Sequence, residues 1–310
     1  MIIKCYHPET LKCFDVITQY SSMIWKRKFY DIGSFELHCP KANLKVNDII
    51  KYGNNSGIVM QVKKDLQETS IYGYDLKSLT SFRTIVGNVT KIGSPESIMK
   101  DLATELLTLG KRKIDGLLVS PCRQQSGSLT KEITDIVFSK FLNDFGKEHE
   151  IGYDITFDEK IMLFDTISPK HKEKSVIFSS KFQNIEEIEY TFDSFNEANV
   201  VFFKPSDGEI QEIGEKIGIY RRESITSDDP NIFLEKNSCT ESIRATANSK
   251  LIYKKDWDLG DFVTVQFNDL VIEKQITEVE EVHETSLTKI VPIFGEEQKN
   301  PIRKLMERGI

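Results

Sequence analysis

Short runs of alternating apolar and polar residues constrain the fold of this 310-residue chain more than any other feature. In residues 34–39, Ser-Phe-Glu-Leu-His-Cys, every second side chain is apolar, which is the period of a strand with one buried face. The same period returns in residues 153–157, 188–192 and 263–267. Turn-forming clusters such as residues 53–57, Gly-Asn-Asn-Ser-Gly, separate the runs. Short strands at this spacing predict an antiparallel barrel or a sandwich.

Two central segments have a helical period instead. Ser94 before Pro95 is a favourable helix start, because the hydroxyl caps the first turn and the proline needs no partner for its missing N–H. We expect Gly110 to end this helix in a left-handed conformation. A second helix is predicted over residues 130–145, closed by Gly146.

Three later segments complete the expected elements. Residues 199–203 are apolar on both faces, which predicts a fully buried strand. Ser238 and Glu241 have the spacing of a capping box, which predicts a short helix reaching about Lys250. The last residues, 300–310, form either one short helix or a loose end.

The order of elements is strands, helices, strands, a short helix and strands. This order predicts a β-rich α+β protein with two antiparallel β-barrel domains around a small α/β insertion. We expect a first barrel in residues 1–93, the insertion in residues 94–182, a second barrel with a short helix in residues 183–296, and a C-terminal tail in residues 297–310.

Composition excludes several classes of protein. A hydrophobic fraction of 39% and a charged fraction of 29% are typical of a globular chain. No run of eighteen apolar residues exists, so no membrane insertion is expected. The charged start predicts a mature N-terminus without a signal peptide. A net charge of −7 argues against sequence-independent nucleic-acid binding, although it leaves open DNA passing through an acidic channel.

A search for catalytic motifs finds no phosphate-binding loop, dinucleotide fingerprint, nucleophile elbow, HExxH helix or CxxC pair. The five cysteines are odd in number and irregularly spaced, so we expect unreactive thiols rather than disulfides. The histidines and cysteines near the N-terminus match no metal-site spacing. Nothing places a histidine and an acid beside Cys122 or Ser126 to activate a nucleophile. The sequence therefore predicts no catalytic residue, no cofactor and no metal.

Charged clusters receive structural interpretations. Adjacent acids, such as those in residues 278–281, are expected on a solvated face rather than as a glycosidase pair across a cleft. Trp25 stands beside three bases, residues 26–28. A core tryptophan flanked by exposed bases is preferred over a nucleic-acid stacking platform.

Several segments have a familiar order. Residues 25–29, Trp-Lys-Arg-Lys-Phe, precede residues 33–37, Gly-Ser-Phe-Glu-Leu. Residues 72–79, Tyr-Gly-Tyr-Asp-Leu-Lys-Ser-Leu, and residues 258–265, Asp-Leu-Gly-Asp-Phe-Val-Thr-Val, follow. Together they resemble the siphovirus ReqiPepy-type tail protein family over about residues 1–300, with Thr80 replacing a leucine of the family motif. The motif residues are Trp25, Gly33, Phe35, Leu37, Asp75, Leu76, Asp258, Gly260 and Asp261.

The motif residues also have interpretations that need no chemistry. Phe35 and Leu37 lie on one side of their strand and should be core. Gly33 is expected at a bulge or a tight bend, and Gly260 at a turn with positive φ.

The family is similar to the baseplate hub proteins of contractile phages. The resemblance implies a non-enzymatic virion protein in the tail of a phage, prophage or phage-like particle, made in the cytoplasm of the bacterial host. It implies a homotrimer whose two barrels per subunit form a pseudo-sixfold ring joining the tail tube to the tail tip. The implied partners are tail tube or distal tail proteins, the tape measure protein and the tip or spike protein. The alternatives are a tail-associated cell-wall hydrolase and a host-surface binding module, for which an exposed aromatic groove is expected.

Overall fold

The computed structural model describes residues 2–123, 127–194, 197–205, 208–227, 229–236, 238–247, 250–284 and 288–295. The expected tail, residues 297–310, and Ser126 lie outside these residues. Two compact units are present. The first contains residues 1–187 and 245–292, and the second contains residues 188–244 and 293–310.

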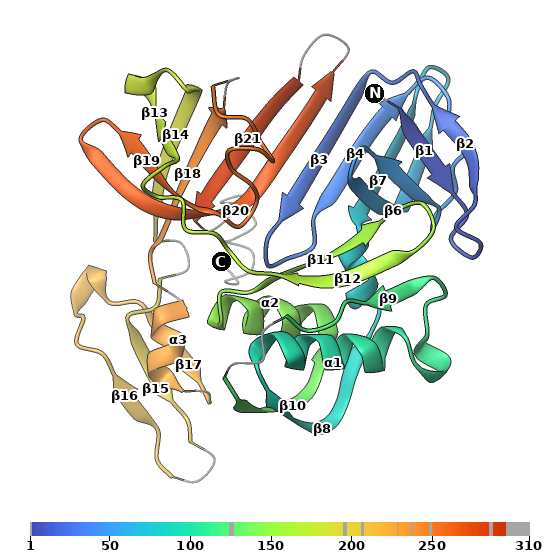
Figure 1. The fold of residues 1–310 in the computed structure, drawn as a ribbon. Helices are drawn as coiled ribbons and strands as arrows, with labels where there is room; N and C mark the ends of the chain where they lie inside the picture. The colour runs from blue at the N-terminus through green and yellow to red at the C-terminus, as the bar shows by residue number, and fades with distance from the viewer. Residues whose placement is uncertain are drawn as a thin grey trace. The chain divides into compact units, whose positions relative to one another are not determined.

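The first unit is built on one large sheet (Figure 1). Its strands are β1 (Ile3–Tyr6), β2 (Cys13–Ile17), β3 (Ser22–Lys28), β4 (Ser34–Cys39), β5 (Ile49–Tyr52), β6 (Asn55–Lys64), β7 (Thr69–Asp75), β13 (Ile177–Ser179), β19 (Phe262–Phe267), β20 (Leu270–Glu284) and β21 (Thr288–Gly295). The order is β21-β20-β3-β4-β7-β6-β5-β1-β2, with β19 paired to β20 and β13 paired to β19. Strand β20, from the last fifth of the chain, therefore lies directly against β3.

The insertion supplies a second group of elements to the first unit. These are the 3-10 helix η1 (Leu76–Thr80), β8 (Thr84–Gly93), α1 (Pro95–Leu107), η2 (Gly110–Arg112), β9 (Leu117–Val119), β10 (Leu129–Val137), α2 (Phe138–Glu148), β11 (Gly152–Phe157), β12 (Met162–Ile167) and η3 (Ser180–Phe182). Strands β8 and β10 form an antiparallel ribbon, and β11-β12-β9 form a three-stranded sheet. In Figure 1, α1 and α2 lie against β12 and β11.

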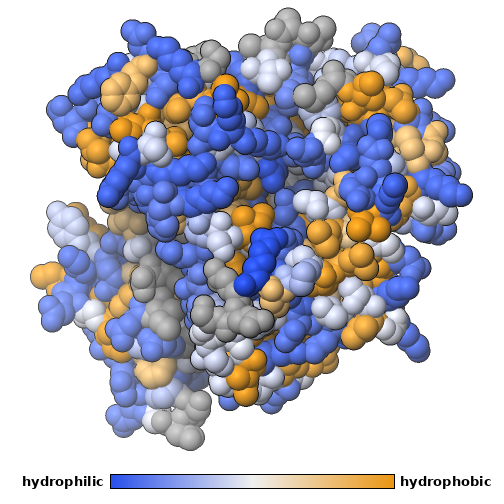
Figure 2. Space-filling model, viewed as in Figure 1, coloured by the Kyte–Doolittle hydropathy of each residue, from blue (hydrophilic) through white to orange (hydrophobic). Residues whose placement is uncertain are grey.

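Two hydrophobic cores stabilise the first unit. One core lies under the main sheet and contains Trp25, Phe35 and Leu37. The other contains the apolar faces of α1 and α2 together with inward residues of β11 and β12, such as Tyr153 and Phe164. Hydrophilic side chains cover much of the visible surface in Figure 2.

The second unit contains a small separate sheet. The elements of the second unit are β14 (Ile185–Asp193), β15 (Val200–Phe203), β16 (Gln211–Ile213), η4 (Gly218–Tyr220), β17 (Glu223–Thr226), α3 (Pro230–Lys236) and β18 (Thr240–Ala247), and the small sheet is β16-β15-β17. Strand β15 pairs with β16 antiparallel and with β17 parallel, and α3 packs on β15. Strand β14 pairs with β18, and most residues of both strands belong to this unit.

Several local predictions are confirmed. The Ser94 side chain accepts a hydrogen bond from the Ser97 N–H at 3.2 Å, and Pro95 is the first residue of α1. Strand β4 alternates between half-buried and buried residues, which places His38 and Cys39 on opposite faces. The predicted strand at residues 199–203 is present as β15, but the expectation that it is fully buried is wrong, because only its two valines are buried and its two phenylalanines are half-buried.

Two predicted helices are wrong. Residues 130–137 belong to strand β10, and α2 begins only at Phe138. β-Branched side chains occupy much of β10 and favour a strand, and the whole segment pairs with β8. The segment after Ser238, for which a capping box and a helix were predicted, is strand β18 from Thr240, in which Ile243 and Ala245 are buried at strand spacing.

Two predicted glycine caps are wrong as well. Gly146 lies inside α2, which continues to Glu148. Helix α1 ends at Leu107 with Thr108 as its C-cap. Gly110 has the expected positive φ of 57°, but it opens the short helix η2 instead of closing α1.

The β-rich α+β class is confirmed, whereas two closed barrels are not. The main sheet ends at β2, and no pairing among the described strands joins β2 to the opposite end. The predicted domain boundaries stay predictions. No helix among the described residues is long and apolar enough to cross a membrane.

Candidate functional site

The resemblance motifs meet where β3 turns into β4. Trp25 on β3 stands opposite Phe35 on β4, and their rings stack with centroids 4.9 Å apart and planes 20° apart. Both side chains are buried, as is Leu37 two residues further along β4. This aromatic pair fixes the distance and the face on which the two strands meet.

Two glycines make room for the Phe35 ring. A Cβ atom at Gly73 on β7 would lie 2.4 Å from Cε1 of Phe35 and 2.1 Å from the Ile58 carbonyl oxygen. A Cβ atom at Gly57 on β6 would lie 2.8 Å from the same Cε1. The stack therefore extends from β3 across β4 to the bare backbone of β7 and β6, which is why a residue without a side chain is needed there.

Gly33 and Asp75 tie the β3–β4 bend to the end of β7. The Gly33 N–H donates to Oδ2 of Asp75 at 2.8 Å, and the Asp75 N–H donates to the Gly33 carbonyl at 3.1 Å. A Cβ atom at Gly33 would lie 2.5 Å from that carboxylate oxygen and 2.2 Å from the Lys26 carbonyl oxygen. The tight bend expected at Gly33 fits this geometry.

A buried lysine continues the same junction. Lys77 in η1 donates to the carbonyls of Lys28 at 2.8 Å and Phe29 at 3.1 Å. Its ammonium lies 4.3 Å from the centroid of the Tyr153 ring, a cation–π arrangement. Leu76 beside it is fully buried. Burial lowers the pKa of Lys77, because the charged form loses its hydration.

Asp75 titrates in an unusual range for an aspartate. Burial raises the pKa of Asp75 to about 7, outweighing the nearby positive charge of Lys77. Its Oδ1 atom has no hydrogen-bond partner among the described residues. A neutral carboxyl at this position needs fewer partners than a carboxylate, which agrees with the direction of the shift.

Arg27 connects three separate segments. Its guanidinium donates to the Tyr253 hydroxyl at 2.8 Å and to Oδ2 of Asp154 on β11 at 3.1 Å. It also lies 3.9 Å from Oδ1 of Asp258. Burial alone would lower the pKa of Arg27, but Tyr253 and the two carboxylates raise it above its ordinary value. The arginine is therefore a permanent cation that links β3 to the insertion and to the loop before β19.

The other two bases of β3 face acids on β20. Lys26 stands opposite Glu280, with Nζ and Oε2 3.1 Å apart, and Lys28 stands opposite Glu278 at 3.9 Å. Glu278 and Glu280 are 1% and 9% exposed. The predicted solvated acidic face is therefore wrong, because the opposing bases compensate these carboxylates and allow them to be buried. The bases themselves are half-buried rather than exposed.

The last motif forms a turn that covers Phe29. Gly260 has φ of +93°, and its N–H donates to the Ile276 carbonyl of β20 at 2.8 Å. A Cβ atom at Gly260 would lie 2.2 Å from Cε2 of Phe29. Asp261 is buried, and its Oδ2 accepts from the Asp258 N–H at 2.8 Å and lies 2.9 Å from Nζ of Lys172.

The structure thus brings the sequence-predicted residues together in one junction. The sequence did not reveal Lys77, Asp154 or Tyr253 as members of it. The sequence does contain one signal of this junction. Residues 26–28 carry three bases and residues 278–281 carry three acids, and both segments are predicted strands. That match indicates paired strands rather than two independent solvated clusters.

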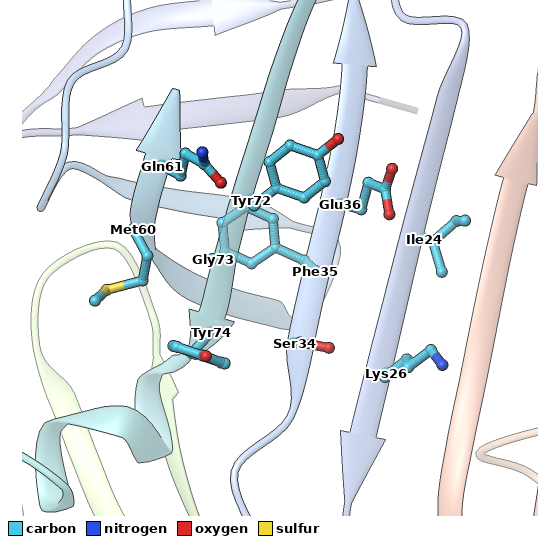
Figure 3. Close-up of a pocket in the computed structure, with 10 residues that line it drawn as sticks. All are labelled: Ile24, Lys26, Ser34, Phe35, Glu36, Met60, Gln61, Tyr72, Gly73 and Tyr74. Atoms are coloured by element: carbon cyan, nitrogen blue, oxygen red, sulfur yellow. The ribbon is translucent and has the colours of Figure 1, made fainter. Parts of the chain in front are cut away.

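A shallow groove of about 280 Å³ lies on the outer face of β3, β4, β7 and β6 (Figure 3). A register irregularity between Val59 and Gln61 accompanies the exposure of both Met60 and Gln61 at its rim. Tyr72 and Tyr74 line it as well, and they are the kind of aromatic side chain expected in the groove of a surface-binding module. The lining residues are Ile24, Lys26, Ser34, Phe35, Glu36, Met60, Gln61, Tyr72, Gly73 and Tyr74.

The charged groups of this groove are already engaged. Lys26 pairs with Glu280, and Oε1 of Glu36 lies 2.6 Å from Nε2 of His38. Among the described residues, no group of three or more His, Cys, Asp or Glu side chains has the arrangement of a metal site. Burial raises the pKa of the Cys5 thiol to about 12 and that of the Cys39 thiol to about 11, so both are poor nucleophiles.

Comparison with solved structures shows which proteins share this fold. The fold matches a tail protein from Neisseria meningitidis MC58 with a TM-score of 0.58 and 13% identity, covering 95% of this chain and 97% of that one. It matches the 43 kDa tail protein of prophage MuSo2 from Shewanella oneidensis with a TM-score of 0.59 and 12% identity, covering 97% and 99%. A chain of the phage P2 baseplate in its activated conformation matches with a TM-score of 0.51 and 10% identity, covering 97% and 100%.

The fold is therefore that of phage tail and baseplate proteins. The model of the family described as Siphovirus ReqiPepy6 Gp37-like protein matches residues 7–218 and 234–296, and the chain belongs to this family. The resemblance noted in the sequence is confirmed. No curated protein matches the sequence.

Replacing Arg27 by methionine should strongly destabilise the first unit. The change removes the charged hydrogen bond to the partly buried Asp154 and the nearby cation of the half-exposed Asp258, which should cost about 1.5–3 kcal/mol. Lys140→Met is the matched control, because Lys140 pairs with Asp144 on the exposed surface of α2 and such pairs contribute about 0–1 kcal/mol. Urea unfolding followed by circular dichroism measures both; equal midpoints for the two variants would contradict the role of Arg27.

Gly260→Ala tests the contact between the last motif and Phe29. We expect a loss of about 2–4 kcal/mol, combining the cost of a positive φ with overpacking against a fixed ring. Gly87→Ala separates the two effects, because Gly87 has φ of +76° and no atom within 4 Å of the position that its Cβ would occupy. Thermal unfolding should show a clearly larger loss for Gly260→Ala; similar losses would mean that Phe29 yields to the methyl group.

Asp75→Asn should change how stability depends on pH. Because the folded-state pKa lies near 7 and the unfolded value near 4, the favourable contribution of protonated Asp75 is complete below about pH 4 and disappears as pH rises through 7. Asparagine does not titrate, so the melting temperature of the variant minus that of the original chain should rise between pH 5 and pH 8. A difference that stays constant over this range would refute the raised pKa.

Proposed function

We propose that this protein is a structural tail or baseplate hub protein that forms a homotrimeric, pseudo-sixfold ring between the tail tube and the tail tip. The observation that carries the proposal is the extent of the structural match. The match to the prophage MuSo2 tail protein covers 97% of this chain and 99% of that one. The match to the phage P2 baseplate chain covers 97% of this chain and 100% of that one. The shared part is therefore the whole fold, and not one domain attached to a different function.

The proposed domain division follows the order of the elements along the chain, whereas the compact units place residues 245–292 with the first unit. Strands β1 to β7 lie in residues 3–75, inside the first proposed barrel of residues 1–93, which also contains β8. The helices α1 and α2 and the sheet β11-β12-β9 lie inside the proposed insertion, residues 94–182. The remaining strands from β14 onward lie in residues 185–295, inside the proposed second barrel of residues 183–296. We further propose that each of the two barrel domains closes into a barrel.

The junction geometry supports a mechanical role without catalysis. Segments from the first and last thirds of the chain are joined by the charge pairs between β3 and β20 and by the contact of Gly260 with Phe29, and Trp25 and Phe35 stack beside them. Such a junction resists local opening, because separating β3 from β20 would leave the buried carboxylates of Glu278 and Glu280 without their bases. We propose tail tube or distal tail proteins, the tape measure protein and the tip or spike protein as partners, and the virion tail as the location.

Oligomeric state tests the proposal directly. Sedimentation equilibrium of the purified, concentrated protein should show a species of three times 35.6 kDa. A cryo-EM map of the assembled tail should show three copies at the junction of tube and tip. One copy or six copies at that level would refute the ring. Release of soluble fragments from purified host cell wall by this protein would favour the hydrolase alternative.

A further inference from the structure

One histidine of the main sheet lies between two carboxylates. Nε2 of His38 is 2.6 Å from Oε1 of Glu36, and Nδ1 is 2.9 Å from Oε2 of Glu68. Glu36 belongs to β4 and lines the groove of Figure 3, whereas Glu68 lies in the connection between β6 and β7. A neutral imidazole has only one N–H, so its other nitrogen would turn a lone pair toward a carboxylate. Both contacts are favourable together only when the ring carries two protons.

The side chains beside His38 on the neighbouring strands are uncharged. Ser22 of β3 and Ser70 of β7 stand opposite it in the ladder. The ring of Tyr72 on β7 is nearly perpendicular to the imidazole, with the ring centroids 6.2 Å apart. The charges that act directly on the imidazole therefore come from the two carboxylates that it contacts.

The next charges along the sheet lie one strand further away. Lys63 of β6 stands opposite Ser70, and Glu284 of β20 stands opposite Ser22. The hydrogen bond to Glu36 raises the pKa of His38, burial partly opposes this, and Glu68 raises the pKa further. The direction agrees with the geometry, because both carboxylates favour the doubly protonated ring.

Glu68 belongs to the tip of the β6–β7 hairpin, residues 65–68. The tip is a preformed turn, because Oδ1 of Asp65 accepts from the N–H groups of Gln67 at 2.8 Å and Glu68 at 2.7 Å. The last cross-strand pair before the tip is Lys64 with Thr69. The tip thus lies beyond the ladder, and side-chain contacts of Glu68 hold it to the sheet.

Glu68 also reaches the start of β3. Its Oε1 accepts from Oγ of Ser21 at 2.8 Å, and the Ser21 N–H donates to the His38 carbonyl at 2.8 Å. The imidazole and this carboxylate therefore join three segments, which are β4, the hairpin tip and the residue before β3.

We propose that His38 is a pH-sensitive clasp, whose doubly protonated ring holds the hairpin tip against β4 and whose neutral ring releases Glu68. The inference is independent of the proposed hub function. It assigns a two-state element to a part of the main sheet that lies outside the junction around Arg27.

Ser70 supplies the alternative partner that the released state needs. Its Oγ lies 3.3 Å from Nδ1 of His38. When Nδ1 gives its proton to water, the Ser70 hydroxyl can donate to the lone pair that forms there, and Glu68 loses its donor. Glu36 keeps its hydrogen bond, because β4 is paired with β3 on one side and with β7 on the other. The neutral ring should therefore carry its proton on Nε2.

The sign of the pH dependence follows from the raised pKa of His38. The clasp contributes fully to stability below the ordinary histidine pKa of about 6.5, and this contribution is lost as pH rises through the higher folded-state value. His38 in turn lowers the pKa of Glu68, so the carboxylate stays ionised where the ring is protonated. The tip should be held at acidic pH and released as pH rises.

Nitrogen NMR of the full chain, labelled with ¹⁵N-histidine, tests the protonation of the ring between pH 5 and pH 9. His38→Gln identifies the His38 signals. Both ring nitrogens should be protonated at pH 6.5, and Nδ1 should lose its proton at a midpoint above 6.5. Glu68→Ala should lower this midpoint. His171 is the matched control, because its Nδ1 meets the single carboxylate of Glu173 at 2.8 Å, and its titration should not respond to Glu68→Ala.

A nitroxide at the hairpin tip tests the release. Leu66 is fully exposed, so Leu66→Cys gives an attachment point without removing a packed side chain. The background carries Cys13→Ser, Cys122→Ser and Cys239→Ser, the three cysteines that are not buried. The electron paramagnetic resonance line shape should become more mobile as pH passes the His38 midpoint. With Glu68→Ala, the mobile line shape should be present at every pH.

The outcomes are distinct. A His38 ring with one proton at pH 6.5, or a midpoint that Glu68→Ala leaves unchanged, overturns the clasp. A label whose mobility ignores the His38 midpoint also overturns it, because the tip would then be held by other contacts. Circular dichroism verifies that each variant is folded. None of these results bears on the trimer, which sedimentation and tail maps test separately.

Discussion

The pairing of bases on β3 with acids on β20 is the interaction on which the rest of the first unit depends. Removing these charges from water is costly, and the cost is offset only when each base meets its acid. A slip of one residue would move the whole set to the opposite face of the sheet, so the charges specify the register as well as the pairing. Arg27 then extends the network to Asp154 in the insertion and to the turn at Asp258. One strand thereby orients three parts of the unit.

Aromatic rings and glycines provide the close packing around that charge network. The rings of Trp25 and Phe35 lie flat across four strands because Gly73 and Gly57 present no side chain. Phe29 is enclosed in a similar way by Gly260. The family motifs are therefore pieces of one junction that are separated by more than two hundred residues. Their spacing in sequence carries no catalytic geometry, whereas their positions in space explain why each residue type is required.

How much could be predicted depended on whether the deciding interaction was local. The cap at Ser94 and the alternation in β4 depend on near neighbours, and both predictions were correct. Residues 130–137 have apolar spacing that suits a helix as well as a strand, and only the pairing with β8 decides between them. Glu278 belongs to an acidic cluster that suggests exposure until Lys28 is placed opposite it.

The sequence by itself determined the β-rich class, the start of α1, the buried face of β4 and, through the order of its motifs, membership of the Siphovirus ReqiPepy6 Gp37-like family. These features depend on periodicity and on residue identity. Only the tertiary structure decided that β20 lies against β3, that the acids of β20 are buried and that the pKa of Asp75 is raised to about 7. The physical reason is that burial and strand pairing depend on residues far apart in the chain, and a charge becomes compatible with the core only after its partner has been brought to it.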